Sequence, residues 1–550
     1  MSKQIVILGG RVITVAGSND DDRWQGVLVQ GDRIVRLVTR QEVADLGPEV
    51  DVVDLGDQTL MPGFVDVHAH AEVVCRTSYK TVDCRAPECG TIPDVLDALS
   101  SYQSSLGAGE WLVGQANLFF DRKLEEKRLP SRAELDSIST ERPIVLRAGG
   151  HISVLNSKAL ALAGIDRKFE PPAHSVTGRP EVIRDGSGEP TGVIKEMDSL
   201  LPLPSPDAEE LRDAIEQGLR KYFTAYGVTT IGEISETIIG IECMNDLAEM
   251  GRLPASIRTY LWSPGTLESL DMVKNWKDHI TLTASERDIR IQGLKLFSDG
   301  GFSAKSAAVN CCYVGHPGFS GSIAFDQYFL RRAFLMTQEA GLQLAVHANG
   351  DRAQDWLCKM VIKLGGANAG RTRMRIEHAG NFMPNPGSAD LWSQAGIIPV
   401  PQPVFIYTFG EYFPDYLGDY GRRGRFPFRT LLDRGWRLSG SSDVWIGSER
   451  EATNPFFSIW CCMKRQTYSG NFIDTDEAIS FDEALRMHTL DAAATMGEED
   501  EKGSLTPGKV ADVIAVNGDP KRMAADEIRS LRPTFVMSRG RTILGMSAAT

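Results

Sequence analysis

Two histidines separated by one residue are the strongest chemical signal in the sequence. His68 and His70 follow the mostly apolar run at 62–67, which predicts a β-strand. Side chains two positions apart point to the same face of a strand, so both imidazoles lie on one side. Imidazole is the commonest metal ligand, and such a pair forms half of a metal site. Two histidines in a polar loop or a core network give the same pattern, so the pair alone does not establish a metal site.

Further candidate ligands stand at the ends of four other predicted strands: Lys295, His347, His378 and Asp443. Functional groups of α/β barrels project from the carboxyl ends of the strands, so these side chains would converge on one mouth. Four histidines, one lysine and one aspartate suit zinc or another borderline divalent metal. Such a metal lowers the pKa of a bound water towards 7. Asp443 could accept a proton there and return it to a leaving nitrogen, although it could instead be a helix cap or a loop residue.

The elements that must hold these residues alternate β-rich runs with helical stretches, which predicts a parallel sheet or barrel. The strand candidates are Phe64–His68, Val145–Ala148, Val228–Ile234, Ile257–Trp262, Ile289–Phe297, Gln343–His347, Met374–His378, Ile397–Pro401 and Leu438–Asp443. The second lies in a region rich in Pro, Gly and charged turns, and removing it leaves eight. We therefore predict an α/β fold with a TIM-like (β/α)8 barrel over residues 64–496, in which residues 80–200 are an insertion that covers the active site.

Both ends of the chain consist of short strands joined by tight turns, such as Gly31-Asp32 between the runs at 26–29 and 33–38. The same pattern of short strands and tight turns is found at 510–516, 534–537 and 541–544. These patterns favour a small antiparallel sheet domain over βαβ units. We expect residues 1–63 and 497–550 to form one composite β-sandwich domain.

The composition excludes several classes of protein. Hydrophobic residues are 42% and charged residues 24%, close to the average of soluble globular chains. The formal net charge of −14 disfavours binding to nucleic acid or to an anionic membrane. No apolar stretch approaches the roughly 18 residues of a membrane span. The first residues do not resemble a signal peptide, and the cysteines number nine, so we expect a cytoplasmic protein with reduced thiols.

On these motifs the sequence resembles the amidohydrolase superfamily. It is most similar to the type-3 branch that contains N-substituted formamide deformylases, with D-aminoacylases more distant. The motifs of that branch include Trp111–Gly114, Leu129–Arg132, Arg147–His151, Asn156–Leu160, Arg184–Gly186, Pro190–Gly192, Lys295–Gly300 and Gly503–Asp512. The chain departs from the branch at Asn117–Asp121 and Leu129–Arg132, where relatives have stretches richer in aromatic residues.

The superfamily pattern is HxH after the first strand, Lys after the fourth, His after the fifth and sixth, and Asp after the eighth. The resemblance therefore implies that His68, His70, Lys295, His347, His378 and Asp443 bind one or two Zn²⁺ ions. It also implies that Lys295 is carboxylated and bridges two metals. A carbamate fits there because an ammonium would be repelled by divalent cations. An uncarboxylated lysine that binds a substrate carboxylate, and a site with one metal, are the alternatives.

A second group of residues is expected to contact the substrate. His151 follows a Gly-Gly pair in the insertion and could donate to a carbonyl oxygen as charge develops, although it could also be structural. Asp299 could face the substrate or support the ligands. Phe120, Phe302 and Trp445 would suit an apolar substrate group or would pack the insertion onto the barrel. The histidines expected on the surface or in packing are His174, His279, His316 and His488.

Together these features predict a metal-dependent hydrolase of a C–N bond in a small, non-peptide amide, with an N-formyl or N-acyl group. An esterase, a lactonase or a cyclic-imide hydrolase is the alternative on the same site, because that site requires only an electrophilic carbonyl. A metal-free scaffold protein is a further alternative, from another class. A homodimer is expected from the base rates of symmetric assembly.

Overall fold

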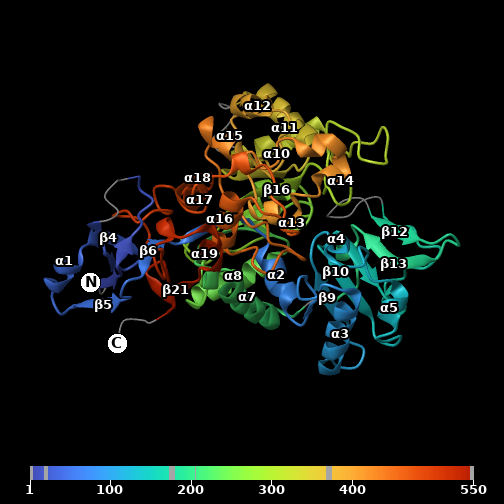
Figure 1. The fold of residues 1–550 in the computed structure, drawn as a ribbon, viewed down its shortest axis with the longest axis horizontal. Coiled ribbons are helices and arrows are strands. Elements are labelled where there is room, and N and C mark those ends of the chain that lie inside the picture. The colour runs from blue at the N-terminus through green and yellow to red at the C-terminus, as the bar shows by residue number, and fades with distance from the viewer. Residues whose placement is uncertain (1–3, 18–22, 173–179, 205, 367–373, 546–550) are drawn as a thin grey trace.

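The computed structural model describes residues 4–17, 23–172, 180–204, 206–366 and 374–545. It contains four β-sheets, of four, five, six and seven strands (Figure 1). The six-stranded sheet lies at one end of the molecule and the strands of the two chain ends lie at the other, with the seven-stranded sheet between them. Among the described helices, none combines the length and the apolar character that a membrane span requires.

The seven-stranded sheet is parallel throughout and forms the centre of the molecule. Its strands are β7 (Phe64–Ala69), β14 (Val228–Ser235), β15 (Ser256–Trp262), β16 (Ile289–Phe297), β17 (Gln343–His347), β18 (Arg375–Glu377) and β19 (Ile398–Val400). Helices between and beside them include α2 (Ala71–Ser78), α7 (Ala208–Tyr222), α8 (Ile238–Glu249), α10 (Gln327–Ala340), α11 (Asp351–Lys363) and α12 (Ser388–Ala395). All eight residues of β14 are buried, as expected for a strand covered on both faces.

The predicted eighth strand is absent from the described residues, and the sheet is nearly closed rather than a complete eight-stranded barrel. Residues 438–444 run beside β7, where the Asp443 amide donates to the His68 carbonyl at 2.8 Å and the His70 amide donates to the Val444 carbonyl at 3.0 Å. Asp443 has φ +43°, outside the β region, so the chain turns before a regular ladder forms.

The region predicted as an insertion contains the six-stranded sheet. Its strands are β8 (Val82–Asp83), β9 (Leu112–Ala116), β10 (Ile144–Ala148), β11 (Ile152–Leu155), β12 (Glu181–Arg184) and β13 (Pro190–Lys195). Helices α3 (Ile92–Tyr102), α4 (Phe120–Lys123), α5 (Arg132–Asp136) and α6 (Ser157–Leu162) accompany it. Val145–Ala148 lies in β10, so this run belongs to the six-stranded sheet and not to the central one. Two apolar clusters of its own stabilise this sheet.

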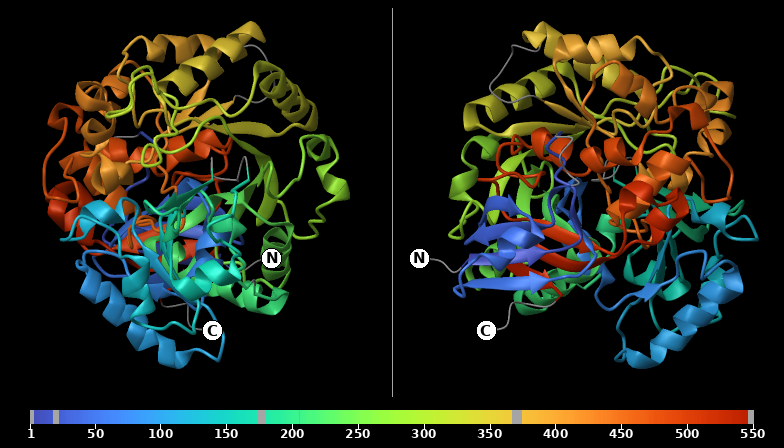
Figure 2. Two further views of the ribbon diagram at one scale, coloured as in Figure 1. Left: turned by 90° about the vertical axis from the view of Figure 1, so that its right-hand side faces the viewer. Right: turned by 60° about the vertical axis from the view of Figure 1, so that its left-hand side comes forward.

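The two chain ends meet in the remaining sheets (Figure 2). One consists of β1 (Gln4–Leu8), β3 (Gly26–Gln30), β4 (Arg33–Val38) and β5 (Val50–Asp54). The other joins β2 (Arg11–Val12) and β6 (Thr59–Pro62) to β20 (Val513–Val516), β21 (Pro533–Ser538) and β22 (Arg541–Leu544). Strands β6 and β20 pair antiparallel, with Met61 opposite Ile514. One apolar cluster draws residues from both sheets, among them Val27, Leu60 and Phe535.

Candidate metal centre

The predicted ligands from the first and fourth central strands lie against Asp443. Nε2 of His68, in β7, is 3.2 Å from Asp443 Oδ1, and Nε2 of His70 is 3.6 Å from the same oxygen. Nζ of Lys295, in β16, is 3.3 Å from His68 Nε2. The two histidines and the lysine are buried. One donor atom from each of His68, His70 and Asp443 lies within 4.8 Å of the others, which is the spacing of a metal-binding group.

The other two predicted histidines complete the same cluster. His347 is the last residue of β17, and His378 follows β18. His378 Nε2 lies 3.0 Å from His347 Nδ1, and His378 Nδ1 lies 4.0 Å from Asp443 Oδ2. The backbone of His378 is left-handed, with φ +74°, so the chain leaves the strand direction at this residue. Asp443 therefore stands between two pairs of histidines, and the six predicted ligands lie together.

Burial sets the protonation of this cluster. It lowers the pKa of His378 to about 4 and lowers the pKa of His70 and of His347 well below the usual value. It also lowers the pKa of Lys295 to about 8. For Asp443, burial acts to raise the pKa, but the neighbouring imidazoles, His68 first, outweigh it and the pKa is lowered. Neutral imidazoles beside an ionised carboxylate are the protonation states that a metal requires.

A divalent metal fits this donor set on the geometry alone. Nδ1 of His70 is a buried polar atom with no hydrogen-bond partner among the described residues, which is costly in a site built only for packing. Gln402 Oε1 lies 2.7 Å from His378 Nδ1, and Glu377 Oε2 contacts His68 Nδ1. These two contacts fix the orientation of each ring and leave the other nitrogen facing the cluster.

A small cavity of about 80 Å³ opens onto the cluster. Its polar side is lined by His70, Lys295, His347, His378 and Asp443, and its other side by aromatic rings, Phe119, Phe302, Phe405, Phe409 and Trp445 among them. His151 also lines it, with Nδ1 3.0 Å from Glu196 Oε2. Burial acts to lower the pKa of His151, but the charge of Glu196 outweighs it and the pKa is raised.

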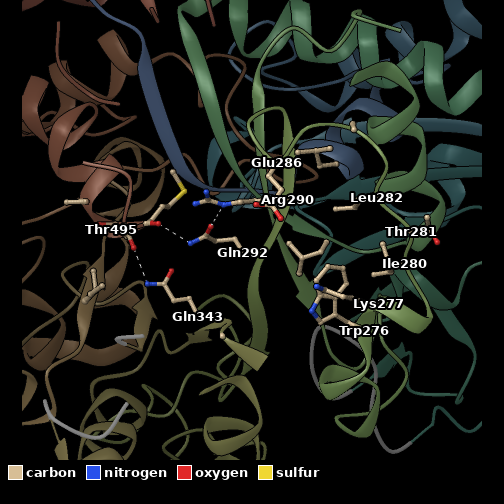
Figure 3. Close-up of a pocket in the computed structure, with 18 residues that line it drawn as sticks. Trp276, Lys277, Ile280, Thr281, Leu282, Glu286, Arg290, Gln292, Gln343 and Thr495 are labelled. Atoms are coloured by element: carbon tan, nitrogen blue, oxygen red, sulfur yellow. Dashed lines mark hydrogen bonds between the residues drawn. The ribbon is translucent and has the colours of Figure 1, made fainter. Parts of the chain in front are cut away.

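A wider cavity, about 780 Å³, lies elsewhere (Figure 3). It is lined by Arg290 and Gln292 at the start of β16 and by Gln343 at the start of β17, so it opens at the amino ends of the strands. Gln292 Nε2 and Gln343 Nε2 donate to the carbonyls of Met496 and Thr495, at 3.0 and 3.1 Å. Chemistry in α/β barrels is placed at the carboxyl ends, where the histidine cluster lies.

Comparison with known proteins agrees with this geometry. Residues 51–544 match the model of the amidohydrolase family (Amidohydro_3), which is most of the chain. The chain belongs to the amidohydrolase family. It is therefore a hydrolase that acts on carbon–nitrogen bonds.

Curated relatives and solved structures align over nearly the whole length of this amidohydrolase. It is 27% identical to an N-substituted formamide deformylase of Arthrobacter pascens, over 96% of both chains. It is 24% identical to a putative amidohydrolase of Bacillus subtilis, over 93% of this chain and 94% of the other. A metal-dependent hydrolase structure from Pyrococcus horikoshii superposes with a TM-score of 0.72 at 20% identity, over 95% of this chain and 99% of the other, and shares the fold.

Not all of the predicted substrate residues face the cavity of this amidohydrolase. His151, Phe302 and Trp445 line it, but Phe120 does not. Phe120 is the first residue of α4 and is buried in the core of the six-stranded sheet. Its neighbour Phe119 has left-handed backbone, with φ +56°, and lines the cavity in its place. The left-handed turn at Phe119 therefore sends the two adjacent rings to different places, Phe119 to the cavity and Phe120 to the core of the six-stranded sheet.

Asp299 also does not line the cavity. Its side chain is fully buried and accepts three backbone amides, from Ala308, Asn349 and Gly350, at 2.8 to 3.0 Å. Its Oδ1 lies 3.6 Å from His347 Nε2. Burial raises the pKa of Asp299 to about 7. The carboxyl group thus holds the loops that follow β16 and β17 and supports His347, rather than facing a substrate.

Several residues near the cluster were not predicted. Glu377 and Gln402 orient ligand histidines, and Asn349 Nδ2 lies 3.2 Å from His347 Nε2. The sequence does point to Glu377, because this residue alternates with Arg375 on a strand and directly precedes the candidate ligand His378. Among the other histidines, His279 and His316 are exposed and His488 is buried. His174 lies outside the described residues.

Proposed function

We propose that this amidohydrolase is metal-dependent and cleaves the C–N bond of a small N-substituted amide with a short acyl group, formyl above all. The observation that carries the proposal is the single buried cluster of four histidines, Lys295 and Asp443 at the carboxyl ends of the central strands. The similarity to an N-substituted formamide deformylase over the full length supports the choice of bond.

One or two divalent ions, Zn²⁺ first, would be held by His68, His70, Lys295, His347, His378 and Asp443. When bound, such an ion polarises the carbonyl and lowers the pKa of water. Lys295 is proposed to be carboxylated, so that its neutral amine forms an N–C bond with CO₂ and releases one proton. Support comes from its complete burial and its place 3.3 Å from His68, where an ammonium would repel the ion.

Two side chains of the protein are proposed to take part in the reaction, Asp443 by moving a proton and His151 by stabilising the negative charge on the carbonyl oxygen. Asp443 is proposed to accept a proton from the attacking water and to return it to the amide nitrogen, since an unprotonated amine anion leaves poorly. His151, which lines the cavity and is held by Glu196, is proposed to donate a hydrogen bond to the carbonyl oxygen as negative charge develops. The aromatic side of the cavity excludes water from the reacting groups.

The test compares matched amide and ester substrates with metal-loaded and metal-stripped enzyme. N-benzylformamide, N-benzylacetamide and benzyl formate are incubated with each form, and the release of benzylamine or benzyl alcohol is measured. We expect N-benzylformamide to be cleaved faster than N-benzylacetamide, and only by the metal-loaded form. Cleavage of benzyl formate with no turnover of either amide would favour an esterase. Equal turnover after metal removal would contradict the metal dependence.

We propose a terminal β-sandwich from residues 1–63 and 497–550, a barrel over residues 64–496 and an insertion at 80–200. The apolar cluster common to the two terminal sheets supports the sandwich, and the separate clusters of the six-stranded sheet support the insertion. A homodimer and a cytoplasmic location are proposed as well, and sedimentation and cell fractionation would test them.

A further inference from the structure

His70 differs from the other three histidines of the cluster in how its ring is held. The ring of each of the others has a polar side chain beside one nitrogen, namely Glu377 for His68, Gln402 for His378 and Asn349 for His347. His70 Nδ1 has no such partner among the described residues, and Nε2 faces Asp443. The ring packs beside Trp262 and Trp445, with centroids at 5.7 and 5.4 Å. The direction of this ring is therefore set by packing and by the backbone that carries it.

That backbone begins helix α2 without a cap of its own. His70 is the N-cap residue, with φ −103° and ψ 63°, and its side chain makes no capping hydrogen bond. The first amides of a helix have no acceptor within the helix. The amide of His70 donates to the Val444 carbonyl at 3.0 Å. The amides of Ala71 and Glu72, which follow, need acceptors from another element.

Glu233 of β14 supplies both acceptors. Its Oε2 accepts from the Ala71 amide at 2.6 Å, and its Oε1 accepts from the Glu72 amide at 3.2 Å. The side chain of Glu233 is fully buried. Burial and the neighbouring Glu72 raise the pKa of Glu233, but the oxygens of a carboxyl group can accept hydrogen bonds in both protonation states. The neighbouring strand thus caps the helix that starts at His70.

The contact between β7 and β14 is shaped for this cap. The register of the two strands shifts just before Glu233, which lies opposite Ala69. The backbones also approach closely, because a Cβ on Gly232 would lie 2.1 Å from the Val67 carbonyl oxygen. Irregularities of this kind redirect side chains next to functional sites. Here the shift places Glu233 beside the turn from β7 into α2.

A second carboxyl group ties the same two turns together in the opposite direction. Glu72, in the first turn of α2, accepts from the Thr237 hydroxyl at 3.0 Å and from the Glu236 amide at 3.3 Å. Thr237 and Glu236 lie in the turn that follows β14. A shift of α2 at His70 would therefore break hydrogen bonds of both Glu72 and Glu233.

We propose that Glu233 is a positioning residue for His70, which fixes the start of α2 and thereby holds the His70 ring toward Asp443 for metal binding. The inference rests on the proposed function, since it requires that the cluster binds a divalent metal. Glu233 does not line the small cavity, so it acts on the metal through the backbone of residues 70–72.

The experiment compares Glu233→Gln with a matched helix-cap variant, Asp326→Asn. The amide oxygen of the new glutamine can accept from one backbone amide, but its nitrogen only donates and cannot accept from the second. Asp326 caps α10 by the same kind of bonds, from the amides of Tyr328 and Phe329 at 3.0 and 2.9 Å. It is exposed, and α10 does not directly follow a predicted metal ligand as α2 follows His70.

Three measurements are made on each protein. Competition with a chromophoric chelator gives the zinc affinity of the folded, metal-free protein. The visible absorption of the cobalt-loaded protein reports the ligands around the ion. Urea unfolding gives the stability separately, so a loss of stability alone is not mistaken for a change at the metal site.

We expect Glu233→Gln to bind zinc about tenfold more weakly than the wild type, as for other residues that orient a ligand, and to have an altered cobalt spectrum. Asp326→Asn should lose stability but keep the zinc affinity and the cobalt spectrum of the wild type. If Glu233→Gln does not fold, by circular dichroism, Glu233→Asp takes its place. That variant keeps the carboxyl group on a side chain shorter by one carbon, and the same changes are expected.

The possible failures are distinguishable. If the wild type binds no zinc, the proposed metal-dependent function fails and this inference falls with it. If the wild type binds zinc and the folded Glu233 variant has the same zinc affinity and cobalt spectrum, Glu233 is only structural and the inference is overturned. An equal loss of zinc affinity in Asp326→Asn would overturn it as well, because the effect would then follow from the loss of any helix cap.

Discussion

The buried carboxylate of Glu377 gives the sharpest prediction about the metal centre. Its side chain is fully buried at the end of β18, where one oxygen contacts His68 Nδ1 and both accept from the guanidinium of Arg375. Arg375 keeps two further acceptors, the hydroxyl of Tyr260 at 2.8 Å and the carbonyl of Val67 at 2.7 Å. Burial acts to raise the pKa of Glu377, but Arg375 and then His68 outweigh it and the pKa is lowered, so this group is a carboxylate.

Glu377→Gln removes the charge while it keeps the shape, and two effects follow. Loss of a carboxylate that orients a ligand histidine lowers metal affinity by about 10–100-fold, or about 1.4–2.8 kcal/mol. Loss of one partner of a buried pair lowers the free energy of unfolding by about 3–5 kcal/mol. The side-chain amide oxygen of the new glutamine and the two other acceptors can still accept hydrogen bonds from Arg375. We therefore expect a loss in the free energy of unfolding at the lower end of this range, about 3 kcal/mol.

Zinc competition with a chromophoric chelator measures the affinity, and urea unfolding of the metal-free protein measures the stability. The matched control is Glu339→Gln, since Glu339 is 59% exposed and pairs with Lys274 at the surface. There the expected loss is about 0–1 kcal/mol with no change in zinc affinity. Zinc affinity within twofold of the wild type and a stability loss below about 1 kcal/mol in Glu377→Gln would refute the reasoning.

Four further predictions test the site and the fold. His68→Ala and His378→Ala should each lose metal and activity together, and full metal content by elemental analysis would contradict the assignment. Asp443→Asn should fold and keep much of its metal, but turnover should fall by about 100-fold or more, with near-normal turnover speaking against a proton shuttle. Lys295→Ala should be inactive and metal-depleted, with partial rescue by a small added carboxylate; electron density for an unmodified amine pointing away from bound metal would oppose carboxylation. Burial lowers the pKa of His488 to about 3, so the folded state binds fewer protons than the unfolded state between about pH 6.5 and 3. Stability should fall with acidification in this window by up to about 1.4 kcal/mol per pH unit, and less steeply in His488→Asn by urea unfolding.

The placement of the ligands could be predicted because strand periodicity is local. His68, His347 and His378 follow apolar runs whose ends are visible in the sequence, and parallel strands bring such ends together. The six predicted ligands therefore lie in one cluster. Glu377 could have been included, since it shares a strand face with the oppositely charged Arg375.

The remaining features depend on contacts between distant segments. Asp443 was expected to end a strand, but its positive φ turns the chain before a regular ladder with β7 forms, although its amide still donates to the His68 carbonyl. Asp299 is held by amides of residues 308, 349 and 350, which no local pattern connects to it. The different positions of the Phe119 and Phe120 rings depend on one left-handed residue, and nothing in the flanking residues requires that conformation.

The pairing of β6 with β20 has a consequence for the synthesis of this protein in the cell. Met61 pairs with Ile514, which the ribosome adds about 450 residues later. At about 5–20 residues per second, the delay is about 20–90 s. During that time the edge of β6 has no partner from the C-terminal strands, and an open strand edge is a site of aggregation. Since β7 follows β6 after a single glycine, the first metal-ligand strand must emerge next to this open edge.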